Sequence, residues 1–360
     1  MTKEKRNFGL DITRALAITL VFTNHLNGVM GLRIGAFWYL AYLGVDIFFA
    51  LSGFLIGGIL IDMCDKERGV LTFSKTLLFL VRRWLRTVPL YFVALLANFI
   101  AAKYIFKTIN SLRWEYFLWV QGFYKYPLSF FGESWSLCIE EWFYFSFALG
   151  LAIFTSLVPK WRLNLRHKVL LFTIFFIIVI TLLRVSLSDY NLTEFNITIF
   201  RLDAIAYGVL FAIVNKFYKI KIKLFWLGLA AMGLSAVGIL LFLLHTRIGR
   251  LYMLYYSLAG FGLGLFVLFL KLTSQWFAKH FRWNGITFIS KISYSIYLFN
   301  LIVIHLLTYF LNDLGNKFVL TVLCFFATLL LSYCTYRLIE LPFLAFRDKH
   351  FTKQRSHQGR

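Results

Sequence analysis

Charged residues are scarce in this sequence. Only 15% of its 360 residues are Asp, Glu, Lys or Arg, whereas 60% are hydrophobic. A soluble globular domain averages about 25% charged and about 45–50% apolar residues, so this composition excludes an ordinary soluble fold. The shortage of charge extends along the whole chain. Long apolar runs lie at 169–183, 224–244, 251–270 and 318–331.

The apolar runs are long enough to cross a membrane. A crossing helix needs about 20 mostly apolar residues, and we predict ten such spans. They lie at 9–28, 36–62, 80–104, 134–157, 169–188, 198–215, 224–245, 251–271, 286–310 and 318–342. The predicted fold class is an all-α integral membrane protein, a bundle of about ten transmembrane helices. Residues 1–345 form this domain, and residues 346–360 form a basic cytoplasmic tail.

Acidic residues are too few to balance the basic ones. The chain has 16 Asp and Glu against 38 Lys and Arg, a net charge of +22. With the predicted spans, termini and loops on the side of the N-terminus hold 26 of the basic residues, and the other side holds nine. Positive residues mark the cytoplasmic side, so we expect both termini in the cytoplasm. Because the charge follows the membrane sides, it does not indicate a nucleic-acid partner.

Cysteines and repeats are also few. The four cysteines show no CxxC pair or metal-type spacing, and no metal site is predicted. The first apolar run lacks a small-residue cleavage site, so we expect no cleaved signal peptide. No internal repeat is visible, which counts against the transporter folds built from duplicated halves.

Ionisable residues inside the first predicted span are candidates for function, because such groups are costly in a membrane. Arg14 and His25 are eleven residues apart. This spacing is three turns plus about 20°, so the two share a helix face and lie about 16 Å apart along the axis. Asp11, three residues before Arg14, is placed to pair with it. The alternative is a snorkelling arginine and a buried histidine that is only structural.

A cluster of arginines opens the third predicted span. Arg82, Arg83 and Arg86 precede Pro89 and Tyr91, on the membrane side of Arg14. Guanidinium groups bind phosphate oxygens in bidentate fashion, so the cluster is suited to a nucleotide diphosphate. The alternative is a positive-inside anchor.

Carboxylates mark the start of the fourth predicted span. Glu133, Glu140 and Glu141 enter an apolar helix that begins with Ser134-Trp135-Ser136-Leu137. One interpretation is that they favour the positive end of the helix dipole. The other is that one of them orients His25, because an acidic partner holds an imidazole in its useful tautomer.

Three further features each leave two interpretations open. Ser52-Gly53 in the second span indicates either close helix packing or the approach of a ligand to the backbone. Arg201 and Asp203 form either an exposed ion pair near the outer surface or part of an acceptor site. The aromatic loop at about 105–133 belongs either to the interfacial belt or to a sugar site.

Several segments together resemble the acyltransferase family 3 membrane proteins, which O-acetylate bacterial glycans. They occur in the order of that family over nearly the whole chain. The segments are Leu10–Ala15 with His25, Phe48–Ile56, Arg82–Tyr91, Ser134–Leu137 with Glu140 and Tyr144, Arg201–Gly208, Ser293–Leu298, and Tyr336-Arg337 with Glu340 and Pro342. Asn300 is a departure, because the family often has His at that position.

The resemblance implies a function and a set of site residues. It implies a bacterial inner-membrane O-acyltransferase that moves an acetyl group from cytoplasmic acetyl-CoA to a hydroxyl of a surface or secreted glycan, such as lipopolysaccharide O-antigen. The acceptor is a glycan or a lipid-linked glycan, membrane lipid surrounds the protein, and an essential Arg14–His25 pair is expected. The expected catalytic residues are His25, Glu140 and Glu133; the expected acetyl-CoA-binding residues are Arg14, Arg82, Arg83, Arg86, Tyr91 and Ser52; the expected acceptor-binding residues are Trp135, Ser136, Arg201, Asp203 and Asn300.

Two mechanisms fit these residues. His25 acts either as general base on the acceptor hydroxyl or as a nucleophile that forms an acetyl-histidine. Two other function classes compete with acyl transfer. A glycan or lipid transporter would need no acyl-CoA, and a structural or sensing protein would tolerate His25→Ala.

Overall fold

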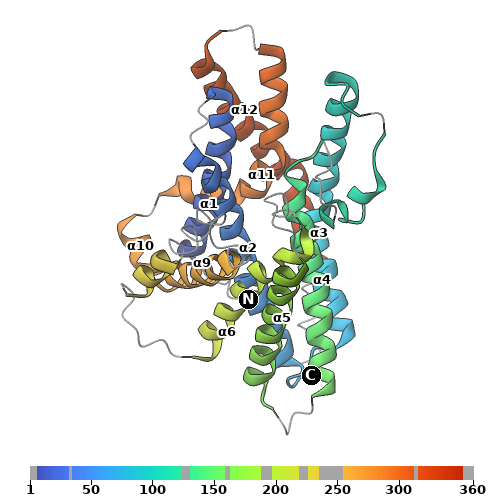
Figure 1. Cartoon of the computed structure of the whole chain (residues 1–360), viewed down its shortest axis with the longest axis vertical. Coiled ribbons are helices and arrows are strands. Elements are labelled where there is room, and N and C mark those ends of the chain that lie inside the picture. Colours follow the sequence, from blue (N-terminus) through green and yellow to red (C-terminus); the bar gives the residue numbers. More distant parts are fainter. Residues whose placement is uncertain are drawn as a thin grey trace.

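The structure is a bundle of long helices (Figure 1). The computed structural model describes residues 6–31, 35–109, 111–123, 130–158, 163–187, 197–218, 226–234, 254–281, 283–311 and 315–351. The helices are α1 (Phe8–Met30), α2 (Gly35–Lys66), α3 (Phe73–Ile100), α4 (Ser134–Leu157), α5 (Leu165–Leu187), α6 (Leu202–Phe217), α9 (Leu254–Leu272), α10 (Ser274–His280), α11 (Asn284–Leu311), α12 (Lys317–Thr335) and α13 (Leu341–Phe351). Short 3₁₀ helices are η2 (Trp114–Tyr116), η3 (Gln121–Phe123) and η5 (Thr198–Arg201), and π-helical turns are η1 (Ala101–Ile105) and η8 (Tyr336–Glu340). These ranges contain no β-strand, and the predicted all-α class is confirmed.

Eight helical stretches are long and apolar enough to cross a membrane. They are Tyr42–Lys66, Phe73–Ile105, Ser134–Leu157, Leu165–Leu187, Thr198–Phe217, Leu254–Leu272, Asn284–Leu311 and Lys317–Phe351. Each matches one predicted span. The predicted first span coincides with α1, whose 23 residues also suffice for a crossing but whose polar side chains lower its hydropathy. Most of the predicted span at 224–245 lies outside the described residues.

Local sequence accounts for the two ends of α1. The Asn7 side chain accepts a hydrogen bond from the Leu10 amide at 3.2 Å and so caps the first turn. At the other end Gly31 adopts φ 70°, a left-handed conformation that favours glycine. Between these caps α1 carries Arg14 in its second turn and His25 near its far end, so one rigid element holds both.

Two helical stretches extend furthest beyond their predicted spans. The predicted third span begins at residue 80, but α3 begins at Phe73, so Arg83 and Arg86 lie well inside a helix. The last span continues from α12 through the π-helical turn η8 into α13. The predicted tail from residue 346 therefore starts inside α13, and its residues 352–360 lie outside the described ranges.

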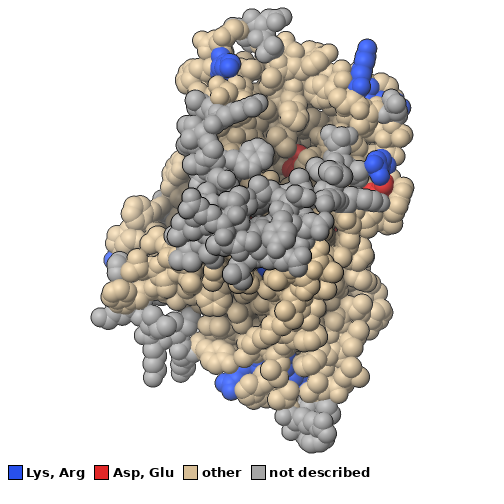
Figure 2. Space-filling view, viewed as in Figure 1, with Lys and Arg blue, Asp and Glu red and all other residues tan. Residues whose placement is uncertain are grey.

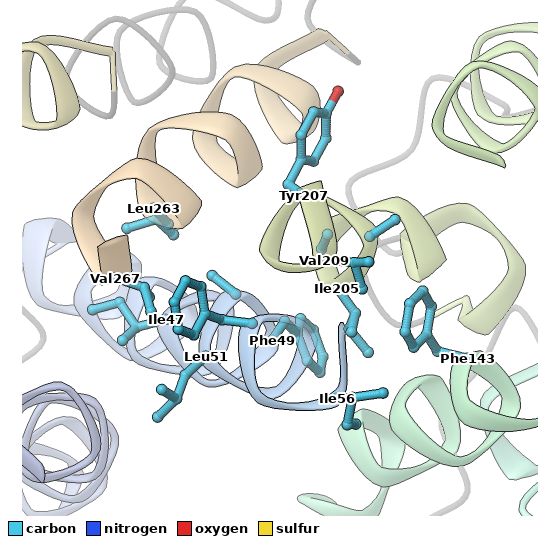
Figure 3. Close-up of a cluster of buried hydrophobic side chains, with 14 of the residues drawn as sticks. Ile47, Phe49, Leu51, Ile56, Phe143, Ile205, Tyr207, Val209, Leu263 and Val267 are labelled. Atoms are coloured by element: carbon cyan, nitrogen blue, oxygen red, sulfur yellow. The ribbon is translucent and has the colours of Figure 1, made fainter. Parts of the chain in front are cut away.

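The larger hydrophobic core surrounds α2. Its buried side chains come from most of the long helices, and Figure 3 shows Phe49, Phe143, Ile205 and Val267 of α2, α4, α6 and α9 pointing into the space between these four. A second cluster joins α3 and α11 with the start of α4, around Tyr91, and includes Tyr116 from η2. The polar site described below lies where α1, α2, α3, α4 and α11 meet.

Helices α2 and α6 cross without side chains between them at two glycines. A Cβ atom at Gly53 would lie 1.8 Å from the carbonyl oxygen of Ile205, and one at Gly208 would lie 2.1 Å from that of Ala50. Real Cβ atoms never approach backbone this closely, so only glycine permits the contact. The helix-packing interpretation of Ser52-Gly53 is confirmed for Gly53, and Ser52 has a separate position in the site.

We expect Gly53→Ala to destabilise the protein by about 1–3 kcal/mol or more, as overpacking does elsewhere. The added methyl group must push α6 away from α2. Gly58 is the matched control, because it lies on α2 and a Cβ there meets no atom within 4 Å. Thermal unfolding in detergent should show a lower midpoint for Gly53→Ala and little change for Gly58→Ala. Equal midpoints for the two variants would contradict the close packing.

Charge is distributed unevenly over the surface. In Figure 2 the most prominent Lys and Arg side chains lie toward the two ends of the molecule, and most of the described surface between them is uncharged. Many large apolar side chains are exposed on this protein, including Phe175, Leu182, Phe326 and Leu330. A soluble protein rarely exposes large contiguous apolar patches, whereas lipid contact accounts for them.

Candidate functional site

One cavity lies among five helices inside the bundle. The space between its lining residues, part of which opens to solvent, is about 760 Å³. Its polar lining consists of Arg14 from α1, Ser52 from α2, Arg83, Arg86 and Thr87 from α3, Ser136 and Glu140 from α4, and Ser293, Tyr294 and Tyr297 from α11. The rest is apolar, chiefly Val45, Phe48, Phe49, Leu51, Leu55 and Leu137.

Arg14 reaches this cavity because another arginine occupies its nearest acid. The Asp11 carboxylate accepts two hydrogen bonds from Arg6, at 2.6 Å to Nε and 2.8 Å to Nη2. It accepts a third from the Ser290 hydroxyl at 2.9 Å. The predicted Asp11–Arg14 ion pair is present, but at 3.8 Å it is longer than a hydrogen bond. Arg6, which the sequence did not single out, is the main partner of Asp11, so the Arg14 head keeps donors for a ligand.

A tyrosine holds Arg83 in place. Arg83 Nη2 donates to the Tyr144 hydroxyl at 2.8 Å, and its guanidinium carbon lies 4.6 Å from the centre of the Tyr144 ring. The Tyr144 hydroxyl donates to Glu140 Oε2 at 2.5 Å. Because that hydroxyl has one proton, the Ser52 hydroxyl donates to Tyr144 in their 2.6 Å contact. Tyr144 therefore ties three predicted site residues together across three helices.

Glu140 consequently belongs with the arginines. Its described hydrogen bond is to Tyr144, and it lines the same cavity as Arg14 and Arg83. The prediction that Glu140 orients His25 is corrected, because the residue that contacts His25 in the structure is Asn300 of α11. The neighbouring Glu141 accepts from Trp84 Nε1 at 3.0 Å and from Thr87 Oγ1 at 3.1 Å, and so fastens α4 to α3.

Three guanidinium groups and one carboxyl group thus share one cavity. Arg14, Arg83 and Arg86 come from two helices, and the charge of Arg86 is balanced in part by the buried Glu340 carboxylate of η8. Such a cluster in an apolar surrounding favours a multiply charged anion, because the field is screened little there. The predicted gathering of basic residues around one site is present for these three arginines.

The structure does not bring Arg82 or Tyr91 to this cavity. Arg82 is not among the lining residues. The Tyr91 side chain is buried in the second hydrophobic cluster, where its hydroxyl donates to the Tyr116 carbonyl at 2.8 Å. Helical geometry explains this outcome, because Arg83 and Arg86 are three residues apart and share a face, whereas Arg82 is turned about 100° away from Arg83.

His25 lies beyond the cavity and contacts Asn300. The distance between His25 Nδ1 and Asn300 Oδ1 is 2.5 Å. Neither residue lines the cavity, but Tyr297, one turn before Asn300 on α11, does. The Tyr297 hydroxyl contacts Ser136 Oγ at 2.5 Å, and its ring packs edge-on against Phe48. Tyr297 and Ser136 therefore stand at the end of the cavity nearest to Asn300 along α11.

Glu133 is buried at the start of α4. Its backbone carbonyl lies 3.0 Å from the Tyr297 hydroxyl and 3.3 Å from Ser136 Oγ, and it accepts from whichever of the two does not donate in their own 2.5 Å contact. Burial raises the pKa of the Glu133 carboxyl to about 8. Its side chain makes no capping hydrogen bond to α4, and its Oε1 has no hydrogen-bond partner among the described residues. The predicted contact of Glu133 with His25 is not formed in the structure.

Arg201 and Asp203 do not pair with each other. Arg201 forms an ion pair with Asp46 of α2, and Asp203 forms one with Arg184 of α5 at 2.8 Å. All four side chains are buried, with at most 7% exposure. The predicted exposed ion pair is therefore wrong, because neighbouring helices supply a separate partner for each charge. A role for Arg201 and Asp203 in acceptor binding stays a prediction.

The remaining aromatic candidates lie outside the cavity. Trp135 is half-buried, and its ring packs edge-on against Phe49, 6.2 Å between centres. In the aromatic loop that was predicted at about 105–133, Tyr116 is buried, whereas Trp114 and Phe117 are exposed. Its predicted members Tyr124 and Tyr126 lie outside the described residues. In the ranges that the structure describes, no group of three or more His, Cys, Asp or Glu side chains is placed to hold a metal ion.

The sequence overlooked two tyrosines. Tyr144 was noted only as part of a motif, although its spacing of four residues from Glu140 places both on one helix face. Tyr297 lay within another noted motif, but its partner Ser136 is 161 residues away. The first contact was accessible from helical spacing, and the second required the fold.

These features define a multi-span membrane protein with a cationic cavity and a buried histidine beside it. The chain belongs to the Acyl_transf_3 family, whose acyltransferase domain matches residues 7–337. This confirms the resemblance drawn from its motifs.

Relatives of this chain have named activities. It is 26% identical over 375 residues to the peptidoglycan O-acetyltransferase OatA of Listeria monocytogenes, covering 95% of this chain and 58% of that protein. It is 27% identical to a putative O-acetyltransferase of Staphylococcus aureus strain COL, covering 93% and 57% of the two chains. The chain thus spans less than three fifths of the length of these relatives. No solved structure matches it.

Proposed function

We propose that this protein is an O-acyltransferase that moves an acetyl group from cytoplasmic acetyl-CoA to a hydroxyl of a surface or secreted glycan. The observation that carries the proposal is the gathering of Arg14, Arg83 and Arg86 in one cavity that is also lined by Tyr297, one helical turn before the Asn300 that contacts His25. The family and the O-acetyltransferase relatives support the same reaction class.

The proposed donor site uses the three arginines for the phosphates of acetyl-CoA. Bidentate guanidinium–phosphate contacts are strong and directional, and the donors of Arg14 remain available because Arg6 engages Asp11. Ser52 and Tyr144 act by holding Arg83. The proposed topology has ten spans in the bacterial inner membrane with both termini in the cytoplasm, so that the donor enters from the side where it is made.

In the proposed reaction His25 serves as general base for the acceptor hydroxyl. The hydroxyl oxygen attacks the thioester carbonyl carbon, His25 takes the hydroxyl proton, the carbon–sulfur bond breaks, and the proton passes to the CoA thiolate. The alternative route forms an acetyl-histidine first and transfers the acetyl group in a second step. Both routes need one unprotonated ring nitrogen of His25.

The proposed acceptor is a bacterial surface or secreted glycan. Lipopolysaccharide O-antigen or a similar polysaccharide is the acceptor class expected from the family resemblance. The name of the Listeria relative adds peptidoglycan to the candidates. The test is transfer of label from [¹⁴C]acetyl-CoA, in membranes that contain the protein, to each of these glycans. We expect labelled glycan that depends on the protein, whereas glycan movement without any need for acyl-CoA would favour the competing transporter.

We expect Arg86→Gln to raise the KM for acetyl-CoA by about tenfold to a hundredfold. A hydrogen bond to a charged group contributes about 1.5–3 kcal/mol, and about 1.4 kcal/mol corresponds to a factor of ten. Lys75→Gln is the control, since it removes the same charge from α3 at a side chain that pairs with Glu67 outside the cavity. Initial rates at varied acetyl-CoA measure both variants. An unchanged KM for Arg86→Gln would contradict the assignment of the cavity to the donor.

A further inference from the structure

We propose that Asn300 is a positioning residue that fixes the tautomer of His25 and thereby assigns the chemical work to Nε2. The inference rests on the proposed function for what Nε2 does. The tautomer itself follows from the contacts of one amide group, and it revises the prediction that Asn300 binds the acceptor.

The orientation of the Asn300 amide is determined by its own helix. Its Nδ2 donates to the carbonyl oxygen of Ile296 at 2.9 Å and to that of Tyr297 at 2.8 Å. An amide nitrogen has two protons, so both are used. If the amide were turned over, Oδ1 would face two carbonyl oxygens. This orientation is unfavourable, because all three oxygens are hydrogen-bond acceptors and none has a proton to donate. Oδ1 therefore faces away from these carbonyls, toward α1.

The oxygen that faces α1 meets His25 and determines its proton. Asn300 Oδ1 can only accept, and it lies 2.5 Å from His25 Nδ1. The opposite tautomer would bring two lone pairs together at this distance. His25 Nδ1 therefore carries the proton, and in the neutral ring Nε2 has the free lone pair. A proton taken up at Nε2 leaves the contact at Nδ1 intact, so the ring keeps its orientation through the reaction.

The same contacts leave Asn300 no group for a sugar. The side chain has 0% exposure and does not line the cavity. Both of its N–H groups and the lone pair directed at α1 are engaged within the protein. Asn300 therefore acts through His25, in the way that an outer partner orients a ring whose other nitrogen does the work.

Two variants test whether Asn300 acts through the hydrogen bond that its Oδ1 accepts from His25. Asn300→Asp and Asn300→Leu have nearly the same size, and each loses the amide NH₂ donors. They differ in that aspartate keeps an oxygen for His25 Nδ1, while its second carboxyl oxygen takes the place of Nδ2 and must carry a proton to donate to the carbonyl of Ile296 or Tyr297. We expect Asn300→Leu to lower kcat for acetyl transfer by about 10²–10⁴-fold, the usual contribution of general base catalysis, with an unchanged KM for acetyl-CoA. Asn300→Asp should recover most of that loss. Wild-type kcat in Asn300→Leu, or equal losses in both variants, would overturn the proposal.

A second measurement reads the tautomer directly. The chain has seven histidines, and the ¹⁵N spectrum of the histidine-labelled wild type minus that of His25→Gln isolates the His25 signals. We expect a protonated Nδ1 and an unprotonated Nε2, and the opposite assignment would overturn the proposal. This readout needs no turnover. If the wild type fails to transfer acetyl groups, the proposed function fails, while the tautomer is still tested.

Discussion

Replacing His25 by glutamine will reduce acetyl transfer from [¹⁴C]acetyl-CoA to glycan by about 10²–10⁴-fold, the range that a positioned general base contributes. Glutamine keeps a polar side chain of similar length but has no nitrogen that takes up a proton. Because His25 does not line the cavity, binding of acetyl-CoA should stay unchanged. Label incorporation and acetyl-CoA binding, measured on equal amounts of protein, separate the two effects.

His167→Gln is the matched control for this prediction. His167 lies in the first turn of α5, where its ring contacts Arg166, and its replacement should leave transfer unchanged. Equal labelling by the wild type and His25→Gln would exclude His25 from the chemistry. Acid-quenched wild type that retains protein-bound label, absent in His25→Gln, would favour the acetyl-histidine route over direct transfer.

The second large effect concerns the buried ion pair between α5 and α6. We expect Asp203→Asn to destabilise the protein by about 3–5 kcal/mol, because it leaves Arg184 buried without its counter-charge. The pair is bidentate, with both distances 2.8 Å, and Arg184 also donates to Ser257 Oγ at 2.8 Å. Thermal or denaturant unfolding in detergent, followed by intrinsic fluorescence, measures the loss.

The double variant Arg184→Met/Asp203→Leu shows whether the loss of stability comes from one unpaired buried charge or from the loss of the ion pair itself. Replacing both charges by apolar side chains of similar volume often leaves stability nearly unchanged, so the double variant should be more stable than Asp203→Asn. If Asp203→Asn unfolds like the wild type, the ion pair does not stabilise the protein as proposed. If that variant also binds acetyl-CoA normally but no longer transfers acetyl groups to glycan, the result would favour the predicted role of Asp203 in acceptor binding.

Helical spacing explains which site residues were predictable from the sequence. Arg14 and His25 on one face of α1, and Arg83 with Arg86 on one face of α3, follow from a repeat of 3.6 residues per turn. The same rule predicts that Arg82 lies on a different face of α3 from Arg83 and Arg86. The ends of the helices were harder to predict from the sequence, because α3 begins at Phe73, before the apolar run that marks its span.

The sequence by itself determined the membrane class, the family and the residue types that carry the chemistry. Hydropathy, the charge of the loops and the order of the motifs are properties of composition and local spacing, and they need no contacts between helices. Only the tertiary structure decided the partners. Arg6 rather than Arg14 engages Asp11 most closely, Asn300 rather than Glu140 holds His25, and Arg201 and Asp203 pair with separate helices. The reason is physical, because a buried polar group takes whichever partner the packing brings within hydrogen-bond distance, and packing joins residues that are far apart in the chain.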